Sequence, residues 1–146
     1  NIAIYGANWE KNNTKSPEIL ATLKGRYISG NALNELYNQS KVVLNVTSWD
    51  GQAELRSGMN MRLVEVPATG SLLMTDEIRE LSDYFDAEKH LVVYRDTADF
   101  KAKLKLMLED DCKREQIAKA GFDHVRSNYT YAESVDTIIN AYNALN

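Results

Sequence analysis

The chain has very little cysteine or histidine: 146 residues include one cysteine and two histidines. A single thiol excludes an internal disulfide, and Cys112 has no partner at metal-ligand spacing. His90 and His124 are far apart in the sequence, and isolated histidines of this kind are usually structural or solvent-exposed. We therefore expect no metal site, and the unpaired cysteine favours a reducing, cytoplasmic setting.

The chain also lacks an excess of positive charge and any long hydrophobic run. Its formal net charge is −4, and 17 lysines and arginines are scattered among 21 acids. No basic stripe follows from this pattern, so nucleic acid is not expected as a partner. No apolar run approaches the roughly 20 residues that cross a bilayer, so no transmembrane segment is expected.

Several common catalytic motifs are absent as well. The sequence has no Gly-x-x-x-x-Gly-Lys loop, no Gly-x-Ser-x-Gly turn and no Cys-x-x-Cys pair, which excludes the commonest nucleotide hydrolases, serine hydrolases and redox enzymes. Asp76 follows an expected strand, as the phosphate-accepting aspartate of a receiver domain does. The paired acids that a receiver domain needs near its first strand are missing.

Short apolar runs alternate with helical patterns along the chain, which is typical of an α/β fold with crossover helices. Hydrophobic residues make up 44% of the sequence, enough for one core. We expect one Rossmann-like domain over residues 1–146 with an open, mainly parallel sheet of about five strands. The expected strands are Ile2–Gly6, Arg26–Ser29, Val42–Thr47, Leu72–Thr75 and Leu91–Tyr94.

Capping signals predict where the helices begin. Ser16 and Pro17 indicate a short helix, and Asn31 is the expected cap of a second one. Asp96 or Thr97 is the expected cap of a third helix, and a further helical pattern runs from about 114 to 125. Thr130 opens a capping box, so the fold divides into the sheet with its helices over 1–128 and a C-terminal helix over 129–146.

The segment from Ser57 to Gly70 is the most informative part of the sequence. At helical spacing Met59, Leu63 and Val66 form an apolar stripe, and Gly58, Arg62, Glu65 and Thr69 form a polar one. A glycine at a helix start lets backbone amides approach an anion, and an arginine one turn in suits a phosphate. Glu65 suits the hydroxyls of a ribose, although an exposed Arg62–Glu65 ion pair is an open alternative. Pro67 should keep this helix short, with its end near Gly70.

Other landmarks occur in the order found in one enzyme family. They are Leu33–Asn45, Asn60–Glu65, Gly70, Leu73–Asp76, Leu91–Asp96, Ala118–Gly121 and Tyr129–Tyr131. Together they resemble the C-terminal half of GT-B glycosyltransferases of the group-1-like set, closest to the CgeB or spore-maturation type. The resemblance implies a domain that binds a nucleotide-diphosphate sugar as donor substrate, with no other cofactor, and an acceptor held by a separate N-terminal domain.

The resemblance also implies roles for individual residues. Glu65 would bind the donor ribose, Arg62 would contact a phosphate, and the backbone around Gly58, Asn60 and Met61 would face the diphosphate. Main-chain groups of Ile28 and Ser29 would lie near the base. Asn45 and Thr47 would line the floor of the site, although such side chains also satisfy strand-end backbone groups.

Three departures from the family pattern bear on activity. Ser57 stands where retaining members commonly have a glutamate, and Tyr129 replaces a histidine. The family's strand and helix before Ile2 are absent, so either Ile2–Gly6 takes the central place in the sheet, or another chain supplies the missing strand, or the sequence is a fragment of a two-domain protein. An exposed sheet edge would favour a homodimer through that edge. The catalytic residues are left unknown, and the isolated chain is expected to be inactive. The alternative is a non-catalytic Rossmann-like module with a binding or structural role at a spore or other surface.

Overall fold

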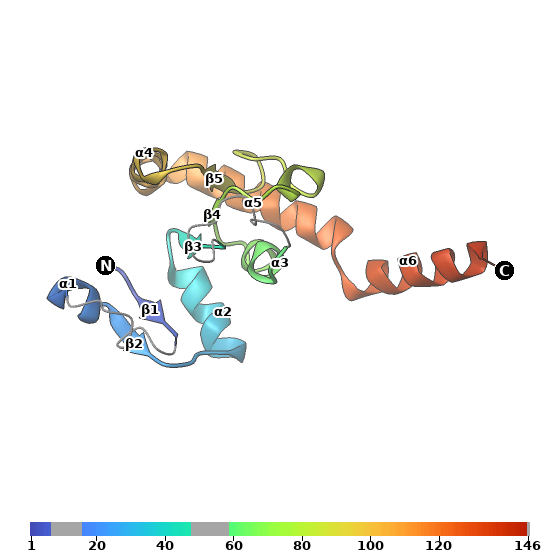
Figure 1. Cartoon of the computed structure of the whole chain (residues 1–146), viewed down its shortest axis with the longest axis horizontal. Coiled ribbons are helices and arrows are strands. Elements are labelled where there is room, and N and C mark those ends of the chain that lie inside the picture. Colours follow the sequence, from blue (N-terminus) through green and yellow to red (C-terminus); the bar gives the residue numbers. More distant parts are fainter. Residues whose placement is uncertain (7–15, 48–58, 146) are drawn as a thin grey trace. The chain divides into compact units, whose positions relative to one another are not determined.

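The structure, a computed structural model, describes residues 1–6, 16–47 and 59–145. Its helices and strands alternate along the chain as far as α4, and two further helices follow (Figure 1). The chain forms two compact units, Asn1–Leu36 and Tyr37–Asn146. The prediction that residues 1–146 form a single domain stays a prediction.

The first unit contains a small parallel sheet. β1 (Ile4–Tyr5) pairs with β2 (Leu23–Gly25), and α1 (Pro17–Leu20) connects them. The helix begins as expected, with Pro17 at its first position and Ser16 before it. Because the proline has no N–H, it is tolerated where a helix has no acceptor to offer.

The strand expected at 26–29 is wrong. β2 ends at Gly25, and the exposed fraction of Tyr27 is 82%. Tyr27 and Ile28 have high strand propensity, but the parallel partner of β1 is the segment that directly follows α1, and propensity without a partner forms no strand. Asn31 is not the helix cap either, because α2 (Gly30–Gln39) already includes it.

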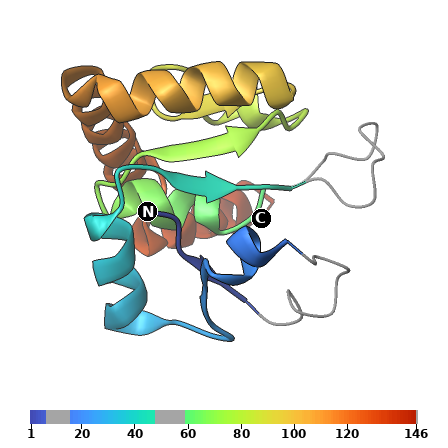
Figure 2. The same cartoon turned by 90° about the vertical axis from the view of Figure 1, so that its left-hand side faces the viewer.

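The second unit contains three parallel strands in the order β3-β4-β5: β3 (Val43–Asn45), β4 (Leu73–Asp76) and β5 (Val92–Tyr94). Figure 2 shows the arrows of β3 and β4 pointing the same way. All four residues of β4 are buried, as expected for a central parallel strand covered on both faces. The predicted α/β class with parallel strands is confirmed, but the described strands lie in two sheets of two and three strands.

Helices follow these strands in the second unit. They are α3 (Arg62–Ala68), the 3₁₀ turn η2 (Leu81–Asp83), α4 (Thr97–Glu109), α5 (Asp111–Asn128) and α6 (Tyr131–Ala144). Two predicted caps are confirmed: Asp96 accepts a hydrogen bond from the Asp99 amide, and Thr130 accepts one from the Glu133 amide. α3 ends at Ala68 and Gly70 has a φ of 78°, so the helix is short, as Pro67 predicts.

Alternate residues of the strands fill two apolar clusters on opposite sides of the three-stranded sheet. Leu73 packs with Leu63 and Val66 of α3, together with Val125 of α5. Leu72 and Met74 pack on the other side with side chains that include Met107 of α4. The sheet is therefore held between helices, and its carboxyl edge is the place where polar side chains gather.

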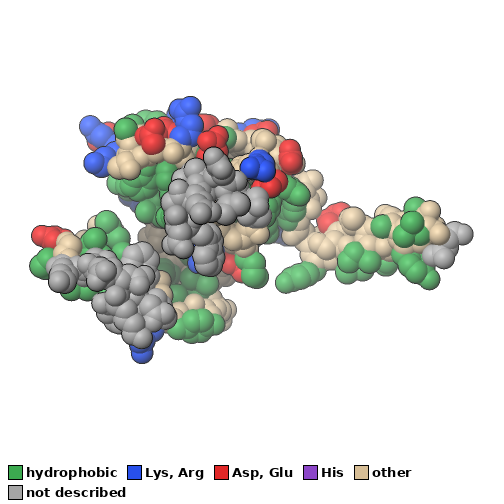
Figure 3. Space-filling model, viewed as in Figure 1, with side chains coloured by type: hydrophobic (Ala, Val, Ile, Leu, Met, Phe, Trp, Pro, Cys, Tyr) green, Lys and Arg blue, Asp and Glu red, His purple; other side chains and the backbone are tan. Residues whose placement is uncertain are grey.

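No residue of α6 is buried, in contrast to α4 and α5. Hydrophobic side chains are visible along it in Figure 3. No helix in the described ranges is long and apolar enough to cross a membrane.

Candidate functional site

Asn45 organises the carboxyl edge of the three-stranded sheet. It is the last residue of β3, and its exposed fraction is 1%. Its side-chain amide donates to the Thr75 hydroxyl at 3.0 Å, and its side-chain oxygen accepts from Asn60 and from Arg62, each at 3.1 Å. The Asn45 side chain thus bonds other side chains, and does not merely satisfy the backbone at the strand end.

Asn60 sets the start of α3. Its side-chain oxygen accepts a hydrogen bond from the amide of Arg62, the first residue of α3, at 3.1 Å, and Met61 between them is the cap residue of the helix. A helix start at Gly58 was expected. Gly58 itself lies outside the described residues, but Asn60, between Gly58 and Arg62, is not helical.

The amides of the first turn of α3 have acceptors within the chain. Leu63 donates to the carbonyl of Asn60, and Val64 and Glu65 donate to the carbonyl of Met61. These amides are therefore occupied, and a ligand at this place would depend on side chains. Met61, whose backbone was expected to face a diphosphate, has an exposed side chain.

Arg62 and Glu65 both lie exposed on α3. Within the described ranges, neither takes part in an ion pair shorter than 4.0 Å, so the exposed Arg62–Glu65 pair is not formed. The Arg62 guanidinium instead contacts the neutral amide of Asn45. A cation and an anion one helical turn apart thus each keep their charge available.

Tyr37 is a neighbour of this pair that sequence reasoning did not identify. Burial raises the pKa of the Tyr37 hydroxyl, the negative charge of Glu65 raises it further, and the positive charge of Arg62 opposes them. The Tyr37 side chain packs against the apolar cluster that contains Leu63. The sequence held no signal that its hydroxyl would share an environment with both charges.

Thr47 and Asp76 form a second strand-end contact. The Asp76 carboxylate is buried and accepts a hydrogen bond from the Thr47 amide at 2.8 Å. The Thr47 hydroxyl is also buried and has no hydrogen-bond partner among the described residues. A groove of about 330 Å³ lies beside Asp76, bordered by Val46, Tyr94 and the first residues of α4. This groove adds a concave surface to the carboxyl edge.

A comparison of the sequence with known protein families identifies the family of this chain. The model of a glycosyl transferase-like family matches residues 1–140. The chain belongs to this family. No curated protein matches the chain. A glycosyltransferase-type function follows from this membership, and the resemblance noted from the sequence is confirmed at the level of glycosyltransferases.

Several of the predicted residues of this glycosyl transferase-like chain lie together in the second unit. Asn45, Asn60 and Arg62 are joined by hydrogen bonds, with Glu65 one turn further along α3. Ile28 and Ser29 belong to the unit 1–36, where the Ser29 carbonyl accepts from the Leu33 amide at the start of α2. Their role beside a nucleotide base stays a prediction.

Ser57 and Tyr129 are two positions where the sequence departs from the family pattern, and the structure describes only Tyr129. Ser57 lies outside the described residues. Tyr129 follows α5 directly, and its hydroxyl donates to the carbonyl of Tyr84 at 3.2 Å. At this position the side chain therefore holds the end of a helix.

Proposed function

We propose that this chain is the donor-binding domain of a GT-B glycosyltransferase, with the CgeB-like group as its nearest kin. It binds a nucleotide-diphosphate sugar, and the sugar passes to an acceptor held by a separate N-terminal domain. Family membership supports transfer of a sugar. The observation that carries the finer proposal is the pair of opposite charges on one exposed side of α3, Arg62 and Glu65, neither of which has an ion-pair partner among the described residues.

Arg62 supplies the positive charge for the diphosphate. A guanidinium has five N–H donors, and the described contact of its Nη1 with Asn45 uses one of them. Its position is set by a side chain that is itself buried and held by Thr75. An arginine fixed in this way has donors left for two phosphate oxygens, and it loses little side-chain entropy when it binds them.

Glu65 supplies the hydrogen-bond acceptor for the ribose. It lies three residues after Arg62, which corresponds to a rise of roughly 4.5 Å along a helix. A carboxylate accepts from both hydroxyls of a vicinal diol, and a free carboxylate does so better than one already paired with a cation. The spacing suits a nucleotide whose ribose and diphosphate contact the same helix.

The chemistry assigned to these residues is positioning and charge stabilisation. Arg62 would stabilise the negative charge that develops on the departing diphosphate, and Glu65 would hold the ribose so that the sugar bond is aligned. A base for the acceptor hydroxyl is expected on the acceptor domain. The chain by itself is therefore expected to bind the donor nucleotide without transferring a sugar.

The test is calorimetric titration of the chain with UDP, GDP and dTDP. Saturable binding of at least one nucleotide is expected, and Arg62→Gln and Glu65→Gln should each weaken it about tenfold or more, since hydrogen bonds to charged groups contribute roughly 1.5–3 kcal/mol. The matched controls are Lys101→Gln and Glu115→Gln, which remove the same charges from exposed positions on α4 and α5. Both should bind as the unaltered chain does.

Two results would contradict the proposal. One is the absence of saturable binding to all three nucleotides by the folded chain. The other is binding that neither Arg62→Gln nor Glu65→Gln changes. Either result would favour a non-catalytic module with a binding or structural role.

A further inference from the structure

Both histidines of the chain lie in one cluster of aromatic rings in the second unit. His90 precedes β5 and His124 is on α5, yet their rings stack with centroids 4.0 Å apart and planes 10° from parallel. Phe85 lies edge-on to His124 at 5.3 Å and stacks on Tyr129 at 5.6 Å. The exposed fraction of His90 is 8%, so its ring is almost removed from water. The glycosyltransferase proposal assigns no role to this cluster.

Hydrogen bonds specify the protonation of the two rings. Nδ1 of His90 accepts from the Asp86 amide at 3.1 Å, and a backbone amide can only donate. That nitrogen must therefore be unprotonated. Nε2 of His124 lies 2.7 Å from the Tyr84 carbonyl, which can only accept, so this nitrogen must carry a proton. The observed geometry requires a neutral His90.

A proton on His90 would meet unfavourable surroundings. Burial lowers the pKa of His90, and the positive charges of His124 and Lys89 lower it further, while Asp86 opposes them. Asp86 and Lys89 are on the same loop and form an ion pair at 2.9 Å. The α5 helix contributes His124, and the uncharged Pro67 of α3 lies close to Gly121 of α5, where a Cβ would be 3.4 Å from that of Pro67. Tyr84 and Tyr129 complete the cluster, and burial raises the pKa of the Tyr129 hydroxyl.

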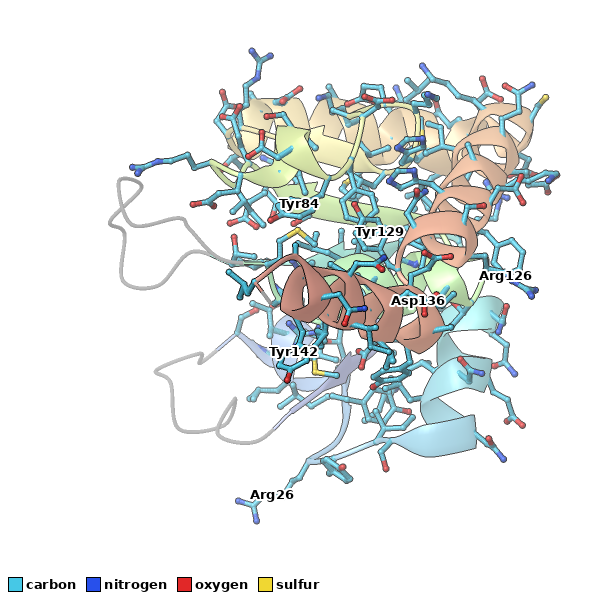
Figure 4. The ribbon with its side chains drawn as sticks, turned by 90° about the vertical axis from the view of Figure 1, so that its right-hand side faces the viewer. Arg26, Tyr84, Arg126, Tyr129, Asp136 and Tyr142 are labelled. Atoms are coloured by element: carbon cyan, nitrogen blue, oxygen red, sulfur yellow. The ribbon has the colours of Figure 1, made fainter. Side chains whose placement is uncertain are left out.

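The cluster holds the junction between α5 and α6. The Tyr84 carbonyl receives a hydrogen bond from His124 and another, at 3.2 Å, from the hydroxyl of Tyr129, the residue that ends α5. Figure 4 shows Tyr84 and Tyr129 close together where α5 leads into α6, and their ring centroids are 6.5 Å apart. The loop 84–90 is therefore the anchor of this junction.

We propose that the His90–His124 stack is a proton-sensitive latch on the α5–α6 junction. At neutral pH the uncharged His90 ring stacks on His124, and the loop 84–90 is held against the end of α5. When His90 gains a proton at Nδ1, the hydrogen bond from the Asp86 amide is lost, because two N–H groups then face each other. The rings then separate, and Tyr129 loses its contact with the loop.

The lowered pKa of His90 indicates the pH range in which the latch opens. The pKa of His90 in the folded chain lies below the ordinary value of about 6.5, so the unfolded chain takes up its proton first as the pH falls. The latch therefore contributes its full stability above pH ~6.5, and this contribution is lost as the pH falls through the folded-state pKa. His90 and His124 are the only histidines in the chain, so no other side chain has an ordinary pKa in this range.

The test is nuclear magnetic resonance of the whole 146-residue chain between pH 7.5 and 5. At pH 7.5 the ring nitrogens should show an unprotonated Nδ1 on His90 and a protonated Nε2 on His124. Towards pH 5, after correction for the intrinsic exchange rate, the Asp86 and Tyr129 amides should lose protection from hydrogen exchange while those of β4 keep theirs. Unchanged protection of Asp86 at pH 5 would overturn the proposal, and so would a protonated Nδ1 on His90 at pH 7.5.

A pair of substitutions separates the latch from ordinary ring packing. In His90→Asn the amide oxygen replaces the Nδ1 acceptor, and in His124→Gln the amide nitrogen replaces the Nε2 donor, so both hydrogen bonds persist without a titrating group. The double variant should lose the change in junction protection between pH 7 and 5. A wild-type pH response in the folded double variant would overturn the proposal; if that variant does not fold, the measurements on the unaltered chain remain decisive.

Discussion

The guanidinium of Arg62 lies 3.1 Å from the side-chain oxygen of Asn45, and this contact joins the start of α3 to the end of β3. The same oxygen accepts from Asn60, whose own side chain receives the Arg62 amide. The three residues form a closed set of hydrogen bonds around one buried amide. Arg62 is thereby directed by a neutral partner, and its charge stays available to an anion.

Replacement of Asn45 should therefore affect stability and binding together. Asn45→Ala removes a buried amide and leaves the Thr75 hydroxyl without its donor, and should lower the free energy of unfolding by about 1–3 kcal/mol. It should also weaken nucleotide binding, because Arg62 loses its support. Urea denaturation measures the first effect, with Asn143→Ala on exposed α6 as the control. A loss smaller than about 0.5 kcal/mol would contradict this assignment.

Gly121 marks the closest approach of α5 to the loop before β5. A Cβ at this position would lie 2.3 Å from the His90 carbonyl oxygen and 3.4 Å from Cβ of Pro67. Glycine to alanine normally stabilises a helix by up to about 1 kcal/mol, but here the clash should destabilise the chain by about 1–3 kcal/mol. Ser127→Ala, at an exposed position near the end of α5, is the control. Thermal unfolding gives the sign, and a stabilised Gly121→Ala would refute the close packing.

Asp111 should make part of the stability sensitive to acid. Hydrogen bonds from Arg114 and then Lys41, followed by the positive charges of both, lower the pKa of the Asp111 carboxyl below 3.8. Its ion pairs are therefore fully present above about pH 4 and are lost as the pH falls through the folded-state pKa. The melting temperature of Asp111→Asn should fall less between pH 6 and 3 than that of the unaltered chain. Asp136→Asn on α6 is the control, and equal falls for all three proteins would contradict the prediction.

Thr130 should control the helicity of α6. Its hydroxyl accepts from the Glu133 amide at 3.2 Å, and no α6 residue is buried, so local contacts carry most of the stability of this helix. Thr130→Ala should destabilise the helix by about 0.5–2 kcal/mol. Thr130→Ser keeps the hydroxyl and should preserve helicity. Circular dichroism distinguishes the two, and identical spectra would show that the cap does not matter.

The sequence was enough to identify candidate residues of the site, but not the contacts that these residues make. Arg62 and Glu65 were identified from their spacing, and both lie exposed on one helix as expected. Their proposed roles stay predictions. The helix start was predicted too early, because α3 begins only at Arg62 and Asn60 before it is not helical. The histidines were expected to be unrelated, since nothing in their sequence separation indicates that their rings stack.

The sequence by itself determined the α/β class, the caps at Asp96 and Thr130, and the short α3 before Gly70, because each depends on contacts within one or two turns of the chain. Only the tertiary structure decided that Arg62 contacts Asn45, that His90 stacks on His124, and that the partner of β1 lies at Leu23–Gly25. These outcomes depend on how distant segments pack. A buried polar group takes whichever partner the packing brings within hydrogen-bond distance, and neither spacing nor propensity specifies that partner.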